Sequence, residues 1–522
     1  MPKRRPCFLY LMTDQHRADW LGAAGHPVVK TPHIDSLAAQ GTRFTRFHVA
    51  SPVCMPNRAS FMTGRYPTTH GLRTNGCLLA QSATTFVDAL RASGYSTASI
   101  GKSHLQPFTG NRPFGHREIE TGPMDEAWHN DGCDYGQEEG DRYAGAQHYA
   151  FATPYYGFDH VDMVTEHGHL ANGHYLQWLR AQTPDWAALR DPANQLPHQY
   201  RCPQAIRTAI PEELYSTAYI RNQACDWLRA QSDSDEPFFV FVSFPDPHHP
   251  FTPPGRYWNM FDPEDFNVGV SHAAHTAPPP PLTKTVAAAL AGKGPVTPQT
   301  AFALLEPRQI KEAMALSAGM LAMVDDAVGD ILTALRQSGR FDETVICFNA
   351  DHGEYMGDSS LMLKGAWSRD SIDRVPFIWS DPEDRSARTS DALASTIDLA
   401  PSILERAGVG PYYGIQGKSL LGNMAGSPEL RESLLIEFND ALPRMGFERA
   451  ARVRTLITNQ HRMSVYQDHE WGELYDRASD AHDIHNRWAD AAHAGVRAEL
   501  ALLLNQHLIK LMDESPTAKR LA

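Results

Sequence analysis

Short runs of apolar and β-branched residues recur along the chain, and stretches with helical periodicity separate them. The runs cover residues 7–12, 96–100, 238–244 and 345–349, and the helical stretches cover residues 34–40, 85–93, 215–231 and 310–338. Strands that alternate with helices favour a mostly parallel sheet with helices on both faces. The run at 345–349 is almost continuously apolar, as expected for a strand covered on both faces. We therefore predict an α/β fold around a large, mostly parallel central sheet.

The pattern changes near residue 430. Residues 433–438, 451–458 and 461–466 are predicted to be strands of a small antiparallel sheet, and a helix is predicted over about 491–512. We therefore divide the chain into a catalytic α/β domain, residues 1–430, and a C-terminal α+β subdomain, residues 431–522. Two stretches, 106–175 and 262–300, have weak periodicity and are expected to be irregular segments over the sheet edge that shape a cleft.

Charge and composition exclude several classes of protein. The net charge of −14 argues against nucleic acid as a partner, because a phosphate backbone requires a basic face. The first apolar run is too short for a secretory signal, and no run is long enough to span a membrane. We therefore expect a cytoplasmic protein without a membrane partner. The seven cysteines are scattered without a CxxC pair, which argues against a disulfide framework or a structural zinc site.

Polar side chains follow each of the four predicted parallel strands. The tails are Thr13-Asp14-Gln15-His16, Gly101-Lys102-Ser103-His104, Pro247-His248-His249-Pro250 and Asp351-His352-Gly353-Glu354. Ligands bind beyond the carboxyl ends of the strands in open parallel sheets. One polar tail has little meaning, because loops are polar in general. Four such tails at the same edge favour a metal-assisted hydrolytic site.

Four residues in these tails are predicted to converge on one divalent cation: Asp14, Gln15, Asp351 and His352. Carboxylate and amide oxygens suit Ca²⁺ or Mg²⁺, whereas an imidazole ligand shifts the preference toward Mn²⁺ or Zn²⁺. Taken alone, Asp14 is equally explained as a turn former and His352 as a hydrogen-bonded residue at a strand end. The metal site is therefore predicted from the four residues together and not from any one of them.

The segment that begins at Cys54 combines a nucleophile with an anion-binding element. Pro56 suits the first turn of a helix and Gly64 suits its end, so Cys54 is predicted to lie at the amino terminus of a helix. Backbone N–H groups and the helix dipole favour anions there. Arg58 lies one turn later on the same face. A buried cysteine at a helix start remains the alternative.

Taken together, these motifs resemble the sulfatase family of the alkaline phosphatase superfamily. The matching segments are Cys54-x-Pro56-x-Arg58, Thr13-Asp14-Gln15, Gly101-Lys102-Ser103-His104, Pro247-His248-His249-Pro250, Asp351-His352-Gly353-Glu354, Lys364-Gly365, and a closing pair at residues 472–476 and 483–486. They occur in the family's order and span nearly the whole chain. The resemblance implies the alkaline phosphatase-like fold and the activity of a sulfuric ester hydrolase.

The resemblance also implies roles for individual residues. A formylglycine-generating maturation system would oxidise Cys54 to formylglycine (3-oxoalanine), whose hydrated form is the nucleophile and joins the ligands of one divalent metal, most simply Ca²⁺, with Mn²⁺ or Mg²⁺ as alternatives. Arg58 would stabilise the nucleophile, and His104 would take the proton that releases sulfate. The substrate would be bound by Lys102, Lys364, His248 and Asn75, with His248 assisting departure of the alcohol or phenol.

Some positions depart from the family pattern and keep a second function open. Met55 and Asn57 stand where small residues are usual. Gln15 with His352 is similar to phosphonate monoester hydrolases, whereas Lys102 with His104 is the sulfatase pair. We therefore expect an arylsulfatase-like hydrolase of small sulfate esters. The alternative is a phosphonate monoester or phosphodiester hydrolase that uses the same site, with cross-activity between the two.

Two further expectations concern partners. A non-catalytic binding protein on the same scaffold is disfavoured, because the cysteine, the acids and both lysines are intact. By analogy with relatives that assemble through loops and tails, a homo-oligomer is compatible with this chain.

Overall fold

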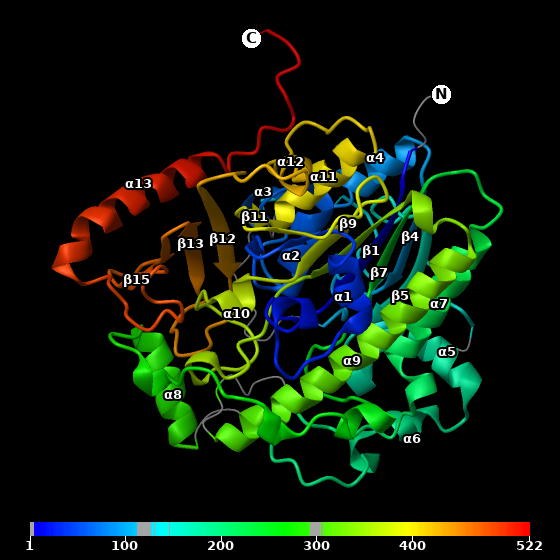
Figure 1. Cartoon of the computed structure of the whole chain (residues 1–522), viewed down its shortest axis with the longest axis horizontal. Helices are drawn as coiled ribbons and strands as arrows, with labels where there is room; N and C mark the ends of the chain where they lie inside the picture. Colours follow the sequence, from blue (N-terminus) through cyan, green and yellow to red (C-terminus); the bar gives the residue numbers. More distant parts are fainter. Residues whose placement is uncertain are drawn as a thin grey trace.

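The computed structural model describes residues 5–111, 127–129, 131–145, 147–292, 303 and 306–521. A nine-stranded sheet forms its centre, in the order β10-β2-β9-β8-β1-β7-β4-β5-β6 (Figure 1). In that order the strands are β10 (Arg388–Ser390), β2 (Thr42–Phe44), β9 (Phe377–Ser380), β8 (Thr344–Ala350), β1 (Cys7–Thr13), β7 (Phe238–Ser243), β4 (Ser96–Gly101), β5 (His160–Thr165) and β6 (Asn172–Gly173). The five strands from β8 to β5 run parallel, whereas β9 and β6 are antiparallel to their neighbours. The predicted fold class is confirmed.

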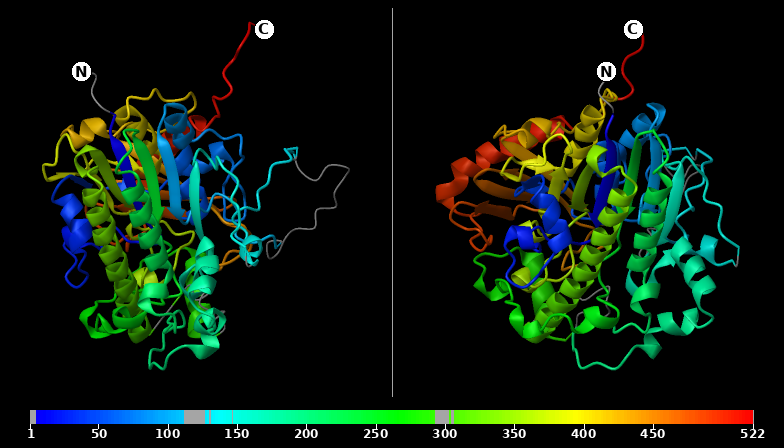
Figure 2. Two further views of the ribbon diagram at one scale, coloured as in Figure 1. Left: turned by 90° about the vertical axis from the view of Figure 1, so that its right-hand side faces the viewer. Right: turned by 45° about the vertical axis from the view of Figure 1, so that its right-hand side comes forward.

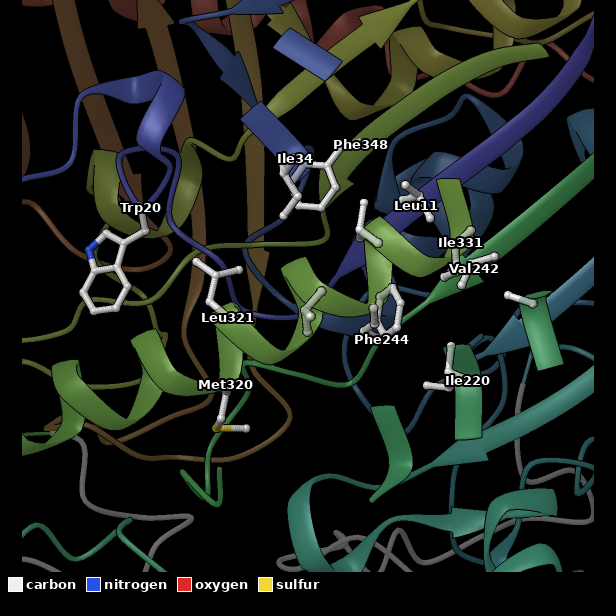
Figure 3. Packing of buried hydrophobic residues seen from close by; sticks show 14 of the residues in the cluster. Leu11, Trp20, Ile34, Ile220, Val242, Phe244, Met320, Leu321, Ile331 and Phe348 are labelled. Carbon is white, nitrogen blue, oxygen red and sulfur yellow. The ribbon is translucent and has the colours of Figure 1, made fainter. Parts of the chain in front are cut away.

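Helices cover both faces of the central sheet. One face is covered by α1 (Pro32–Ala38), α7 (Ser216–Ala230) and α9 (Pro307–Gln337), and the other by α2 (Cys54–Thr63), α4 (Phe86–Ala92) and α11 (Leu399–Arg406). Side chains of β1 alternate between the two cores: Leu11 packs with the α7 and α9 residues, and Tyr10 packs on Phe61 of α2. Figure 3 shows Leu11 and Val242 from the sheet beside Ile331 of α9. Because both faces are buried, β1, β7 and β8 are mostly apolar, whereas β4 has mainly small residues at its buried positions.

A second, four-stranded antiparallel sheet lies to one side of the central sheet (Figure 2). It consists of β12 (Ser433–Asn439), β13 (Arg452–Thr458), β14 (His461–Tyr466) and β15 (Gly472–Asp476). Helix α13 (Ala494–Ile509) packs against it through Leu500 and Leu504. The remaining elements are α3 (Pro67–His70), α5 (His174–Gln182), α6 (Trp186–Arg190), α8 (Pro280–Leu290), α10 (Asp370–Asp373), α12 (Leu421–Met424), and the paired strands β3 (Phe47–His48) and β11 (Ala394–Ser395).

The two stretches expected to be irregular contain regular structure. Strand β5 lies within 106–175 and pairs in parallel with β4, so the sequence prediction is wrong there. Its residues alternate in polarity, because the strand lies near the edge of the sheet. Helix α8 lies within 262–300 and begins at its prolines, which fit a first turn whose N–H groups have no helical acceptors. Residues 112–126, 130, 146 and 293–300 of these stretches lie outside the described residues.

No helix in the described part of the chain is both long and apolar enough to cross a membrane.

One glycine fixes how β4 delivers its tail to the sheet edge. Gly101 ends β4 with φ 104°, and an added Cβ would lie 1.9 Å from the carbonyl oxygen of Ser243 on β7. The same carbonyl accepts the N–H of Lys102 at 2.9 Å. The close approach of the two strand ends therefore requires a residue without a side chain, and it places Lys102 beside β7.

We expect Gly101→Ala to lower the free energy of unfolding by about 2–5 kcal/mol, because left-handed strain costs about 1–2 kcal/mol and overpacking costs about 1–3 kcal/mol. Gly94→Ala is the matched control, because Gly94 also has a positive φ of 87° but an added Cβ would meet nothing within 4 Å. The control should lose only about 1–2 kcal/mol. Urea unfolding of both variants measures the difference, and equal losses would contradict the close-approach argument.

Candidate active site

The ends of β1, β4 and β8 and the start of one helix meet at the carboxyl edge of the central sheet. Asp14 follows β1, Lys102 follows β4, and Asp351 and His352 follow β8. Cys54 is the first residue of α2, as the sequence predicts. All five are buried, and each is at most 2% exposed. No side chain at the N-cap position accepts the first N–H groups of α2. Asn75, from a loop, accepts the N–H of Met55 at 3.2 Å instead. The helix end therefore faces the site with its positive dipole.

The side chains at this edge include a set of candidate metal ligands. One ligand atom each from Asp14, Cys54, Asp351 and His352 lie within 4.8 Å of one another. Cys54 Sγ lies 3.0 Å from His352 Nε2 and 3.9 Å from Asp14 Oδ1. His352 Nδ1 donates to the carbonyl of Gly353 at 2.8 Å, which turns Nε2 toward the cluster, as a hydrogen bond from the other ring nitrogen does for metal-binding histidines. Two carboxylates and one imidazole fit a divalent cation.

Gln15 lies next to this cluster but its side chain contacts other groups. Its backbone, at φ 60°, donates to Asp351 Oδ1 at 3.1 Å. Its Oε1 accepts from Lys364 Nζ at 2.8 Å, and its Nε2 donates to the Glu354 carboxylate. Lys364 Nζ also donates to His248 Nε2 at 2.9 Å. The structure thus brings Gln15, Lys364 and His248 together, and the assignment of Gln15 as a metal ligand stays a prediction.

Arg58 holds the two carboxylates in place. Its Nε donates to Asp351 Oδ2 at 2.8 Å and its Nη2 lies 3.3 Å from Asp14 Oδ2. Its Nη1 donates to the carbonyl of Lys102 at 2.7 Å and to Ser243 Oγ at 2.9 Å. A planar guanidinium with five fixed donors suits this arrangement. One side chain therefore links the ends of β1, β4, β7 and β8.

The unusual residues around Cys54 have structural roles. The Oδ1 of Asn57 accepts the N–H of Ala50 at 2.9 Å, and its Nδ2 donates to the carbonyl of Asp351 at 2.5 Å. Met55 Sδ accepts the N–H of Gly76 at 3.3 Å. Asn57 thus ties α2 to the loop that follows β8, and Met55 fixes the turn that carries Asn75.

His104 is held by a buried carboxylate that sequence reasoning missed. Glu138 accepts the N–H groups of His104, Leu105 and Gln106 at 2.8, 2.9 and 3.2 Å. The His104 backbone has φ 57°, and its ring stacks on Phe108 with centroids 3.8 Å apart. Its Nδ1 has no partner among the described residues. Burial and the neighbouring Lys102 lower the pKa of His104 well below its ordinary value, so its ring is neutral.

His167 also lies in the site and was missed for a specific reason. It follows β5, which lies in a stretch predicted to be irregular. Without a predicted strand there, the sequence does not indicate that its polar tail reaches the sheet edge. The segment Glu166-His167-Gly168-His169 has the same polar character as the four recognised tails. His167 Nε2 lies 2.6 Å from Lys102 Nζ, and its ring stacks on His248 with centroids 3.7 Å apart. A fifth strand end therefore contributes to this edge.

The electrostatics of the cluster favour charged forms at its centre. Burial opposes ionisation of Asp14, but Lys102 and His248 outweigh it and lower the pKa of the carboxyl well below its usual range. Burial and Asp14 oppose ionisation of Cys54, but Lys364, His352 and Lys102 together lower the pKa of the thiol. The charges around residue 54 therefore favour a negatively charged side chain at this position.

Comparison with protein families gives two matches. The family described as Sulfatase matches residues 6–409, and the family described as N-sulphoglucosamine sulphohydrolase, C-terminal, matches residues 362–510. The first match includes Asp14, Cys54, Lys102, His248 and Asp351.

Individual proteins show the same similarity. The chain is 27% identical over 512 residues to the uncharacterized sulfatase YidJ of Escherichia coli K12, covering 98% of this chain and 88% of that protein. It is 26% identical over 425 residues to an arylsulfatase of Clostridium perfringens, and the match covers 80% of this chain and 78% of that protein. The phosphonate monoester hydrolase of Agrobacterium radiobacter superimposes with a TM-score of 0.77 at 25% identity, covering 99% of this chain and 98% of that one.

Proposed function

The chain belongs to the sulfatase family, and we propose that it hydrolyses sulfate monoesters through a formylglycine made from Cys54 beside one divalent metal ion. The observation that carries this proposal is the position of Cys54. It begins α2, lies 3.0 Å from His352 Nε2, and shares one cluster with Asp14 and Asp351. A residue at this point can be a metal ligand and a nucleophile at once.

The chemistry of the site supports conversion of the cysteine. Cys54, Pro56 and Arg58 form the motif that the resemblance assigns to the formylglycine-generating maturation system. Formylglycine, once hydrated, supplies one hydroxyl as nucleophile and a second hydroxyl whose deprotonation releases the product. A divalent metal ion supplies a Lewis acid that favours the ionised hydroxyl. Asp14, Asp351, His352 and residue 54 would hold that ion, with Gln15 beside them.

Two lysines are placed to neutralise the transferred group. An ammonium has three donors. Among the described residues, Lys102 Nζ donates to Asp14 and His167, and Lys364 Nζ donates to Gln15 and His248. Each lysine therefore has one donor left for a sulfate oxygen. Positive charge fixed before the substrate binds stabilises the transition state without reorganisation.

A lysine–histidine pair and a second histidine are placed for proton transfer. His248 Nδ1 donates to the carbonyl of His249 at 2.6 Å, so its Nε2 accepts from Lys364. We assign the Lys364–His248 pair to leaving-group departure, with Lys364 as the proton donor. His104 is neutral and its Nδ1 has no partner among the described residues, so it suits the base that takes the proton from the second hydroxyl.

A second candidate function has its own supporting observation. Gln15, an amide and not a second carboxylate, lies beside the candidate metal ligands and accepts a hydrogen bond from Lys364 Nζ. The solved phosphonate monoester hydrolase covers nearly the whole chain. Phosphonate monoesters and sulfate monoesters both present a tetrahedral anionic centre, so one site can act on both. We therefore keep phosphonate monoesters and phosphodiesters as alternative substrates.

We expect the tryptic peptide that contains Cys54 to carry formylglycine when the protein is produced with the maturation system. Mass spectrometry detects the change, because an aldehyde replaces the CH₂–SH group. Ser51 lies in the same tryptic peptide, residues 47–58, and supplies an internal control residue that stays unmodified. Cys54→Ala should lower kcat/KM by about 10³-fold or more, since the nucleophile is lost. An unmodified thiol in an enzyme with full activity would refute the proposed nucleophile.

We expect kcat/KM for an aryl sulfate to exceed kcat/KM for the matched aryl phosphonate monoester and phosphodiester by at least about tenfold, or about 1.4 kcal/mol of transition-state binding. The three substrates share one leaving group, so the ratio reports on the transferred group alone. Gln15→Asp should shift the ratio further toward sulfate. A much larger kcat/KM for the phosphonate would reject sulfate as the preferred ester and favour the alternative.

A further inference from the structure

A second group of metal-ligating side chains lies next to the first. One ligand atom each from Asp14, His167 and His248 lie within 4.8 Å of one another. The three residues follow β1, β5 and β7, so three different strand ends contribute. Asp14 belongs to both groups. Its Oδ1 lies 3.5 Å from His352 Nε2, and its Oδ2 contacts Lys102 and lies 3.7 Å from His167 Nε2. The carboxylate therefore bridges two cation positions.

The ammonium of Lys102 occupies this second position. Lys102 is fully buried, and its Nζ donates to Asp14 Oδ2 and to His167 Nε2. Because an ammonium has no acceptor, His167 Nε2 accepts this bond with its lone pair. That lone pair is the one that would bind a metal. His167 thus meets Lys102 with the atom and protonation state of a metal ligand.

The third member, His248, is in the same state. Its Nδ1 donates to the His249 carbonyl at 2.6 Å, which leaves the lone pair on Nε2. A hydrogen bond from the other ring nitrogen to a carbonyl is the usual support of a metal-binding histidine. Its ring is parallel to that of His167 within 15°, with centroids 3.7 Å apart. Stacking holds both rings with Nε2 near Asp14, and the His248 lone pair there accepts from Lys364 Nζ at 2.9 Å.

We propose that Asp14, His167 and His248 form a second cation site, which the Lys102 ammonium fills, and that Zn²⁺ binds there when this ammonium is removed. His167 is then a positioning residue, because it orients the Lys102 ammonium. The inference rests on side-chain geometry and is independent of whether the substrate is a sulfate or a phosphonate.

Buried charge provides the driving force. Among the described residues, Arg58 is the one permanent cation that the Asp14 Oδ2 keeps without Lys102, and an under-compensated buried charge is strongly destabilising. A divalent cation would restore the balance. One carboxylate and two imidazoles with an open position are a common zinc ligand set. Zinc is therefore the probe of choice over calcium.

The test is zinc content, measured by elemental analysis after gel filtration of the whole protein with Zn²⁺. Lys102→Ala should retain one more zinc per chain than the wild-type protein, and the double variant Lys102→Ala/His167→Ala should lose that extra zinc. Lys364→Ala is the matched control. It removes a lysine that donates to His248 but, among the described residues, makes no hydrogen bond to Asp14 or His167, and it should retain no extra zinc. Because activity is not measured, the result is separate from the proposed function.

Lys102→Ser is prepared in parallel, because either single variant can be unstable without metal. If both unfold, the proposal predicts that added Zn²⁺ raises their melting temperatures and leaves that of the double variant unchanged. Two results would overturn the proposal. One is no extra zinc, or no zinc-dependent stabilisation, in the Lys102 variants. The other is extra zinc that persists without His167, or that appears equally in Lys364→Ala.

Discussion

Two carboxylates, Asp14 and Asp351, are fully buried at the edge of the central sheet, and the surrounding structure depends on their neutralisation. An unpaired buried charge is prohibitively costly, so each carboxylate must meet cations or N–H donors. Arg58 contacts both, Lys102 contacts Asp14, and the backbone N–H of Gln15 contacts Asp351. The cluster still has the geometry to accept a divalent ion. Neutralisation of these two carboxylates therefore requires the cations and N–H donors that several strand ends bring to this point.

The sheet supplies the convergence, and small local features supply the precision. Parallel strands end at the same edge, so polar tails that are far apart in the sequence become neighbours. Gly101 lets β4 approach β7, Asn57 ties α2 to the carbonyl of Asp351, and Glu138 holds the backbone of His104. None of these residues has a role in the proposed chemistry itself. Each limits the movement of a residue to which we assign such a role, as a preorganised site requires.

The sequence predicted the parts of this molecule that follow from burial on both faces. The strands β1, β7 and β8 were found because their residues are mostly apolar, and β4 because its short run contains β-branched residues. The tails of these strands then identified Asp14, Lys102, His248, Asp351 and His352. Strand β5 was missed because it lies near the edge and alternates in polarity, and with it His167 was missed. Glu138 was missed because a long loop brings it to His104, and no local pattern encodes that contact. The stacking of His167 on His248 likewise depends on tertiary structure.

The central claim is that Asp14, residue 54, Asp351 and His352 surround one catalytic divalent cation. Anomalous diffraction from crystals of the wild-type protein grown with Mn²⁺ tests it most directly. The account predicts one strong anomalous peak within coordination distance of both carboxylates and of His352 Nε2, with residue 54 facing it. A map with no peak between these side chains, or with its strongest peak elsewhere in the chain, would contradict the account.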